Sequence, residues 1–363
     1  MLENKPIHIT YIWRLVPEKG IDIVLACIRR WLSEKRNIVW HICWDGEKID
    51  EFREIEKYEK SEIKIYGHID KQRLHQVLDT TDLVLMPSLF LETFGLVALE
   101  SISRGVAVCG FARGWLTEFI HPTLALDSTD PVNSFFTILD SHSFPLVDVS
   151  RFSYSHWREQ LELLTAWYHR ILLVSDYTSL VWGTEQYIDS LAESLRSIGK
   201  TVEIHGYGGR VTRSIRIWLM LLTPFAFWRG RSLSSKIKKV QPDLIWMHSI
   251  LRYIGPHWLY AIADVKCSTY ITHHDLWLIT PFPSRIYSES DIASSPSLWD
   301  WIGKDMNIFD ILAVWVKWVI SSWIWSLFRQ IDPTHVLPSP WMSSHFRKYT
   351  QNTPTIFPHT SKE

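Results

Sequence analysis

The stretch 87–100 places two carboxylates at a junction where a chain could bind an anion. It follows a buried apolar run and opens a helical pattern, and at such a junction backbone N–H groups and the helix dipole attract negative charge. Glu92 and Glu100 are separated by seven residues, which is ~12 Å along a helix axis and too far for a paired-carboxylate dyad. Either they bind different parts of one extended ligand, or they only cap the helix and lie in solvent.

The elements that must position this stretch alternate between short apolar runs and amphipathic segments. The first half predicts strands over Ile7–Trp13, Ile38–Cys43, Ile63–Tyr66, Leu83–Met86 and Val106–Cys109. It predicts helices over Glu18–Arg36, Glu51–Lys60, Lys71–Leu78 and Thr93–Arg104, then a loop-rich stretch near Pro122–Pro145 and a helix over Tyr154–Tyr168. Alternation at this spacing indicates βαβ units and a parallel sheet covered on both faces.

The same pattern restarts near residue 170. Strands are predicted over Ile171–Ser175, Thr201–His205, Leu244–His248, Thr269–Thr272, His335–Pro338 and Pro354–Phe357, with helices over Thr184–Ile198 and Met342–Tyr349. Ile311–Phe328 is apolar but contains Lys317, which favours a buried or interfacial helix over a membrane span. The sequence thus predicts an α/β protein of two domains of similar size, with a boundary at about residue 170.

Composition narrows the classes of function. The chain has 363 residues, is 46% hydrophobic and 21% charged, and has a formal net charge of -1, which excludes a disordered chain and argues against a dedicated nucleic-acid binder. The four cysteines lie far apart, without a C-x-x-C or H-E-x-x-H motif, so we expect reduced, mostly buried thiols and no metal site. The first residues contain no apolar core of signal-peptide length, which predicts a cytoplasmic location.

A basic window lies between Glu203 and Asp243. It contains eight Lys and Arg residues and no acidic residue, around the apolar segment Ile217–Trp228, which is too short to span a bilayer. Basic flanks around a short apolar helix fit the surface of an anionic leaflet, so residues 210–239 could contact the inner face of the plasma membrane. The alternative is a solvated helix face beside a loop.

Segments of the first half resemble motifs of the large retaining GT-B family of nucleotide-sugar glycosyltransferases, in the family's own order. Residues 87–100 resemble its E-x7-E signature, residues 11–20 (YIWRLVPEKG) its donor-phosphate loop, and residues 43–47 (CWDGE) its G-D-G turn. Residues 65–68 (IYGH) are similar to its base-contacting segment and residues 114–118 (GWLTE) to its G-G-l-p-E segment. The resemblance covers residues 1–168 and implies that 1–150 is the donor domain.

The second half resembles the family's acceptor domain. Residues 174–188 resemble its opening glycine-rich loop and helix, residues 242–249 (PDLIWMHS) and 331–339 two of its strands, and residues 272–276 (THHDL) the segment with its active-site His-Asp pair. The family places the acceptor domain first, so the order here is reversed. The resemblance implies a circularly permuted GT-B fold, in which two Rossmann-like domains, 1–150 and 171–363, face a cleft and are joined by a crossover helix and linker over 151–170. The alternative is the end of one transferase joined to the beginning of its neighbour.

The resemblance implies roles for the donor-domain residues. Arg14 and Lys19 would neutralise the leaving diphosphate, Glu100 would bind the ribose hydroxyls, and Tyr66 would contact the base. Glu92, together with the backbone of Phe94 and Gly95, would hold the transferred sugar.

On the acceptor side, the resemblance implies that His274 lies over the donor sugar and assists by hydrogen bonding, with His273 as the neighbouring alternative. The loop at Trp182 and Gly183 would face the donor phosphates or the acceptor. Because no D-x-D motif stands where a metal-bridging one is expected, we expect metal-independent transfer without a cofactor.

Tryptophan is unusually frequent, with 20 of 363 residues. Trp13, Trp44, Trp115 and Trp182 stand in motif slots where the family has Gly, because the backbone there turns with φ > 0 or approaches a phosphate closely. An indole in these slots would fill the ligand's volume. We hypothesise that many tryptophans are UGA codons, which some bacterial lineages read as Gly; genuine tryptophans in these slots predict a catalytically inactive homologue.

The sequence therefore predicts a retaining glycosyltransferase of the hexosyltransferase type (EC 2.4) that acts in cell-envelope polysaccharide biosynthesis. Its expected partners are a nucleotide-diphosphate sugar and a lipid-linked or polysaccharide acceptor hydroxyl, and nucleic acid is not expected. The alternative is a non-catalytic or incomplete protein made of two glycosyltransferase halves.

Overall fold

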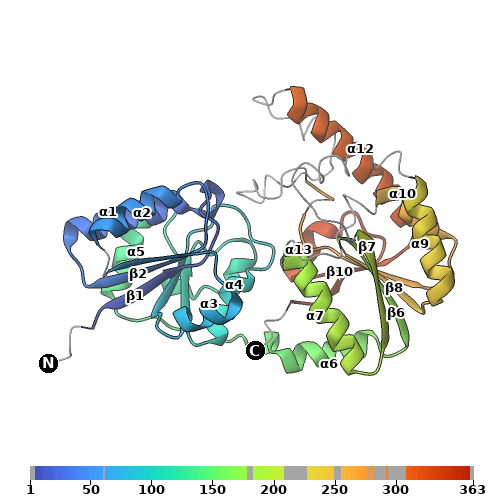
Figure 1. The fold of residues 1–363 in the computed structure, drawn as a ribbon, viewed down its shortest axis with the longest axis horizontal. Coiled ribbons are helices and arrows are strands. Elements are labelled where there is room, and N and C mark those ends of the chain that lie inside the picture. Colours follow the sequence, from blue (N-terminus) through green and yellow to red (C-terminus); the bar gives the residue numbers. More distant parts are fainter. Residues whose placement is uncertain are drawn as a thin grey trace. The chain divides into compact units, whose positions relative to one another are not determined.

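The computed structural model describes residues 5–59, 62–177, 183–207, 227–248, 255–276, 278–280, 292 and 308–359. These residues form two compact units, each with its own parallel sheet (Figure 1). Unit 1 contains residues 5–154 and His359, and unit 2 contains the described residues between Ser155 and Pro358. The division falls inside the segment 151–170 that was expected to connect two domains.

Unit 1 is built on a parallel sheet with the strand order β3-β2-β1-β4-β5. Its strands are β1 (Ile7–Tyr11), β2 (Ile38–Cys43), β3 (Ile63–Gly67), β4 (Leu83–Met86) and β5 (Ala107–Gly110). Its helices are α1 (Ile21–Glu34), α2 (Ile49–Tyr58), α3 (Lys71–Leu78), α4 (Leu96–Ser103) and α5 (Pro131–Asp140), with short 3-10 turns at Pro17–Lys19, Gly114–Glu118, Pro122–Leu124 and Ser150–Phe152. Figure 1 shows α1, α2 and α5 on one face of the sheet and α3 and α4 on the other. This double cover explains why β4 is buried along its whole length.

Helix α5 corrects the sequence-based expectation of loop-rich structure over 122–145. Asp130 caps the helix, because its side chain accepts a hydrogen bond from the backbone N–H of Asn133, and Pro131 occupies the first turn. A proline is compatible with the first turn of a helix, where its missing N–H has no intrahelical partner. Pro131 therefore begins a helix at a point where it had been interpreted as part of a loop.

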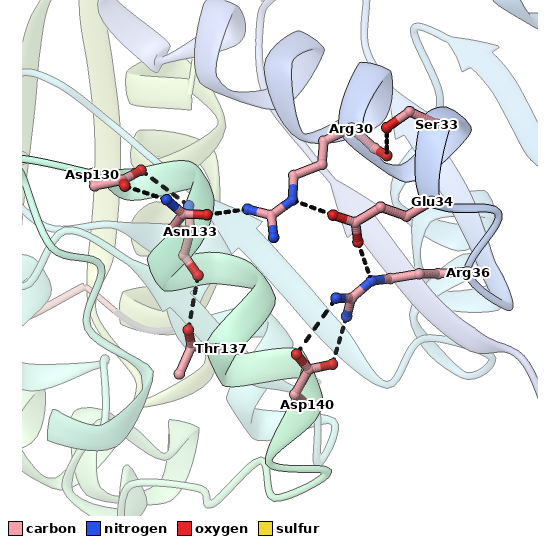
Figure 2. A network of polar contacts seen from close by, with 8 residues as sticks. All are labelled: Arg30, Ser33, Glu34, Arg36, Asp130, Asn133, Thr137 and Asp140. Carbon is pink, nitrogen blue, oxygen red and sulfur yellow. Dashed lines mark hydrogen bonds and ion pairs between the residues drawn. The ribbon is translucent and has the colours of Figure 1, made fainter.

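A polar network joins α5 to α1 on the outer surface of unit 1 (Figure 2). Glu34 accepts hydrogen bonds from Arg30 at 2.6 Å and from Arg36 at 2.5 Å. Arg30 and Arg36 reach across to Asn133 and Asp140 of α5, and both guanidinium groups lie over the ring of Phe136. These contacts fix α5 against α1 although the ions themselves are partly exposed, so they contribute little stability individually.

Unit 2 repeats the architecture with a six-stranded parallel sheet in the order β11-β10-β9-β8-β6-β7. Its strands are β6 (Arg170–Tyr177), β7 (Thr201–Tyr207), β8 (Leu244–His248), β9 (Ser268–Thr272), β10 (Thr334–Leu337) and β11 (Thr355–Ile356). Its helices are α6 (Tyr154–Leu164), α7 (Gly183–Ser197), α9 (Phe227–Val240), α10 (Gly255–Ala263), α12 (Ile308–Ile331) and α13 (Pro340–Phe346). Figure 1 shows α7 on the opposite face of this sheet from α9 and α10. The two parallel sheets confirm the predicted α/β class.

The apolar stretch around Lys317 forms the predicted helix, α12. The helix is only partly buried, because Ile320 is buried whereas Leu312 and Trp315 are exposed. Lys317 is buried, and its ammonium group donates a hydrogen bond to the carbonyl oxygen of Thr280 at 3.2 Å. Among the described residues, we find no helix whose length and apolar character would let it cross a bilayer.

Candidate functional site

The candidate site of unit 1 lies where the connections of the sheet reverse direction. From β1 the chain moves outward to β2 and β3, then crosses back to form β4 on the other side of β1. In open α/β sheets, ligands bind outside the carboxyl ends of the strands at such a switch point. The loops that follow β1 and β4 contain the two segments singled out from the sequence, 11–20 and 87–100.

These two loops are held against each other through their backbones. The N–H of Leu89 donates to the carbonyl oxygen of Glu18 at 3.0 Å. Gly20 has a φ of 73°, and a Cβ at this position would lie 1.9 Å from the carbonyl oxygen of Pro87. Only glycine fits this approach, so Gly20 fixes the distance between the loops.

The loops bring Lys19 and Glu92 into direct contact. The Nζ of Lys19 lies 2.7 Å from Oε1 of Glu92, and the side chains are 9% and 10% exposed. Ser88, which is buried, also donates to Oε1 of Glu92 at 3.0 Å. Burial lowers the pKa of Lys19 and the neighbouring Glu92 carboxylate opposes that shift. The carboxylate therefore has two defined donors from two different parts of the chain.

Aromatic rings surround the Lys19 ammonium group. Its Nζ lies 4.2 Å from the centre of the Phe90 ring and 5.3 Å from the Trp13 ring, which are distances typical of cation–π contacts. Arg14 is exposed beside this cluster. The hydroxyl of Tyr11 donates to the carbonyl oxygen of Arg14 at 3.1 Å, so the base of the loop is anchored while the guanidinium group faces solvent.

Phe94 and Gly95 form the entrance to α4. Gly95 has a left-handed backbone at the N-cap, and Phe94 is buried in an aromatic cluster. The rings that contact Phe94 are those of Trp115, Phe119, Phe152 and His359, with centroids 5.1 to 6.3 Å away. The cluster fixes the start of α4, and burial lowers the pKa of His359 to about 4.

Glu100 lies in surroundings different from those of Glu92. It is on α4, and its Oε1 is 3.6 Å from the Nζ of Lys71 on α3. Glu92 instead belongs to the loop and binds Lys19 and Ser88. The arrangement agrees with the inference that the two carboxylates do not form a dyad.

Tyr66 ends a polar chain that crosses three strands of unit 1. His41 lies between His8 and Tyr66, with 2.9 Å from its Nε2 to His8 Nδ1 and 2.9 Å from its Nδ1 to the Tyr66 hydroxyl. The rings stack, and the guanidinium group of Arg73 lies 5.6 Å from the Tyr66 ring. Burial lowers the pKa of His41 to about 4 and raises that of Tyr66.

The motif tryptophans differ in their backbone conformation. Trp44 has a φ of 148°, a region that side chains other than glycine rarely adopt, whereas Trp13 and Trp115 are absent from the described residues with positive φ. Trp115 is buried, and its Nε1 has no hydrogen-bond partner among the described residues. Trp182 lies outside the described residues, and Gly183 is the first residue of α7.

In unit 2, the structure separates His273 from His274. His273 is buried, its Nε2 lies 2.9 Å from Nδ1 of His335, and burial lowers its pKa well below the usual value. His274 is half-buried, and its Nε2 lies 3.1 Å from Nδ1 of His248. The contrast favours His274 as the residue that reaches a ligand and His273 as part of the core.

Several contacts of these sites were not identified from the sequence. Ser88 and Phe90 lie inside the stretch 87–100, only a few residues from Glu92. Their place in the site could therefore have been predicted from the sequence spacing. His248 lies in the quoted segment 242–249 but had no role assigned. His41 gave no signal, because its contact with Tyr66 depends on the register of β2 and β3.

The cysteines and acidic residues give no indication of a metal centre in the described part of the chain. All four cysteines are free thiols, and Cys27, Cys43 and Cys109 are buried. Burial raises the pKa of Cys27 and Cys43 to about 12. Within the ranges that the structure describes, no group of three or more His, Cys, Asp or Glu side chains is placed to hold a metal ion.

Comparisons with known proteins concentrate on unit 1. Residues 2–124 match the family model of glycosyl transferases group 1, about a third of the chain. An uncharacterized 41.2 kDa protein in the cps region of Klebsiella pneumoniae is 31% identical over 144 residues, covering 39% of this chain and 38% of that protein. Glycogen synthase of Bacillus cytotoxicus is 38% identical over 105 residues, covering 29% of this chain and 21% of the synthase. The matches thus span well under half the length of either relative.

Among solved structures, the pneumococcal O-GlcNAc transferase GtfA, in complex with UDP and GlcNAc, gives a TM-score of 0.32 at 21% identity, with 39% of this chain and 30% of that chain covered. The match to the family model is the more informative finding for unit 1. It includes the sequence from Trp13 to Glu100 that forms the candidate site, so the similarity to glycosyl transferases group 1 lies in the part of the chain that contains this site.

Proposed function

We propose that the protein is a glycosyltransferase that moves a sugar from a nucleotide-diphosphate donor to a hydroxyl of a lipid-linked or polysaccharide acceptor, with retention of configuration. One observation carries the proposal: the Lys19–Glu92 contact stands at the switch point of a sheet whose sequence matches glycosyl transferases group 1. A cation and a carboxylate at this position suit a ligand with both phosphates and sugar hydroxyls.

In this proposal the donor lies along the carboxyl ends of the unit 1 strands. Lys19 and Arg14 bind the diphosphate, and Glu92 with the backbone of Phe94 and Gly95 binds the sugar. Glu100 accepts hydrogen bonds from the ribose, and Tyr66 contacts the base. Fixed cations that stabilise the charge developing on the leaving phosphate lower the barrier, so no metal is required.

The transfer exchanges one bond to the anomeric carbon for another. The bond to the diphosphate oxygen breaks on the face that the acceptor oxygen attacks, and the acceptor's proton passes to the departing phosphate oxygen. His274 donates or accepts a hydrogen bond at the donor sugar, and the loop at Trp182 and Gly183 faces the phosphates or the acceptor. In this arrangement the two domains follow a circularly permuted order.

A second candidate is a non-catalytic protein built from two transferase halves, and Trp13 favours it. Its indole lies beside Lys19, where the proposed diphosphate would bind. We propose instead that glycine stands at codons 13, 44, 115 and 182 in the organism, through UGA decoding. The φ of 148° at Trp44 supports this proposal. The codons at these positions, and mass spectrometry of the native protein, test it; UGG codons would overturn it.

A donor screen by thermal shift tests the activity proposal. Full-length protein and the W13G variant are heated with nucleotide sugars that carry uracil, guanine or adenine. A ligand that binds only the folded form raises the melting temperature, so one donor should raise that of W13G. The matched control is W167G, which removes an exposed tryptophan outside unit 1. The proposal fails if no donor stabilises W13G.

We further propose that residues 210–239 contact an anionic membrane surface at the inner face of the plasma membrane. On α9, Trp228 is 60% exposed and Arg231, Lys238 and Lys239 are exposed, a combination typical of interfacial helices. Residues 208–226 lie outside the described ranges. Flotation should recover the protein with anionic vesicles and not with neutral ones, and equal recovery with both would contradict the proposal.

A further inference from the structure

Two hydrogen bonds between histidine rings cross neighbouring strands of the unit 2 sheet, and they differ in burial. The Nδ1 of His248, the last residue of β8, lies 3.1 Å from Nε2 of His274, which follows the end of β9. The Nε2 of His273 lies 2.9 Å from Nδ1 of His335, between β9 and β10. His274 is half-buried, whereas the other three rings are buried. The His248–His274 pair thus links a buried ring to one that reaches solvent.

The ring of His248 is enclosed by two aromatic residues. Trp246 stacks on it with 5.7 Å between centroids and 24° between planes, and Tyr187 of α7 lies 5.9 Å away. Trp246 is itself fixed, since its Nε1 donates to the Thr272 hydroxyl at 2.8 Å. Packing therefore determines the direction in which Nδ1 of His248 points.

His274 takes its orientation from the same neighbours. It bonds to His248, and the Tyr187 ring meets its ring at 72° with 5.2 Å between centroids. A neutral imidazole has one donor and one acceptor nitrogen. The protonation of Nδ1 on His248 therefore decides whether Nε2 of His274 is a donor or an acceptor, and with it the tautomer of His274.

We infer that His248 is a positioning residue, which holds the ring and the tautomer of His274 for glycosyl transfer. This inference rests on the proposed function, in which His274 hydrogen-bonds at the donor sugar. His248 is fully buried, so it acts through His274 and does not touch substrate. Its removal should affect turnover and leave the donor affinity almost unchanged.

Three substitutions at His248 separate its hydrogen bond from its bulk. H248N keeps a polar group near the position of Nδ1, H248Q moves that group to the position of Nε2, and H248F keeps a ring without the bond. We expect H248F and H248Q to lower kcat about 10- to 100-fold, since a small misplacement of a catalytic group costs that much. KM for the donor should stay within about twofold, and H248N should recover most of kcat.

Nitrogen-15 NMR of histidine-labelled, full-length protein gives a readout independent of activity. The His274 signals are assigned by their loss in H274A. One tautomer is expected in the wild type and in H248N, and a mixture in H248F. Unchanged His274 signals in H248F would overturn the inference. Absence of turnover in W13G, together with the expected NMR changes, would overturn the proposed function alone.

The buried pair provides the matched control. H335F removes the bond to His273 in the aromatic core and should lower the melting temperature without changing the His274 tautomer. H335N, which keeps a polar group near Nδ1, should be less destabilised. If H335F mixes the His274 tautomers as H248F does, the effect is a general loosening of the sheet and the positioning role is wrong.

Discussion

Lys19 and Glu92, from loops that follow different strands, form an ion pair of 2.7 Å with both side chains about nine-tenths buried. The pair joins the loop after β1 to the loop after β4, and Ser88 adds a second hydrogen bond to the same carboxylate oxygen. Each charge is the other's counterion in an environment where an unpaired charge is strongly unfavourable. The two residues proposed to bind the donor therefore also determine how the loops are held.

A double-mutant cycle on this pair should show strong coupling. E92Q and K19M should each lower the free energy of unfolding by about 2–4 kcal/mol, because each substitution leaves a buried group without its partner. The double variant should lose clearly less than the sum of the two. Urea unfolding of the four proteins measures the coupling.

An exposed ion pair provides the matched control. Arg29 and Glu51 lie 3.0 Å apart with side chains 66% and 43% exposed. E51Q should change stability by less than about 1 kcal/mol. Additive losses at Lys19 and Glu92 would show that the buried pair contributes no more than this surface pair.

Gly20 and Gly105 separate steric exclusion from backbone strain. Both have a left-handed backbone, with φ of 73° and 79°. A Cβ at Gly20 would lie 1.9 Å from a carbonyl oxygen, whereas a Cβ at Gly105 would meet no described atom within 4 Å apart from those of its chain neighbours. G105A should cost about 1 kcal/mol of stability. G20A should cost at least about 2 kcal/mol more, because the loops must separate. Thermal unfolding measures both, and equal losses would mean that the loops can move apart easily.

The sequence predicted most elements of both sheets, because continuous apolar runs bounded by helical patterns are strong local signals. Ile38–Cys43, Leu83–Met86 and Leu244–His248 form strands with the expected bounds. Helix α5 was missed because Pro131 was interpreted as a loop residue. Asp130 before it is a residue type that favours the N-cap position and could have indicated the helix. The family resemblance implied that Lys19 and Glu92 bind different parts of one donor, but it did not predict their direct contact.

Contacts that depend on register or on side-chain direction could not be predicted. The pairing of His41 with Tyr66 requires the alignment of β2 with β3, which includes a register shift after Ile42. The choice between His273 and His274 required knowing which ring faces the core. Neither fact is contained in local propensity or spacing.

The buried imidazole of His41 should make unit 1 sensitive to acid. Its pKa is lowered to about 4 by burial, with Lys64 and His8 acting in the same direction. The unfolded chain therefore binds a proton before the folded protein does, and stability present above pH ~6.5 is lost as the pH falls toward ~4.

Replacing His41 should remove this contribution. H41N keeps a polar group near the Tyr66 hydroxyl, and the slope of unfolding free energy against pH in that window should fall by up to about 1.4 kcal/mol per pH unit. H142N, which replaces an exposed histidine with a left-handed backbone, is the control and should leave the slope unchanged. Chemical unfolding at several pH values measures the slopes, and equal slopes in wild type and H41N would refute the assignment.

Replacement by glycine should change the free energy of unfolding much less at Trp44 than at Trp115. Trp44 is half-buried with a φ of 148° and makes an edge contact with His68 at 4.5 Å, so W44G relieves backbone strain of about 1–3 kcal/mol while losing modest packing. Trp115 is buried among Phe94, Phe119 and Phe152, so W115G should leave a cavity that costs about 3–5 kcal/mol. This packing, unlike the backbone of Trp44, does not support glycine at codon 115. We expect the free energy of unfolding of W44G to lie within about 1 kcal/mol of that of the wild type, and that of W115G to be far lower. If W44G loses as much as W115G, the backbone at position 44 does not favour glycine, and the structural support for glycine at that codon disappears.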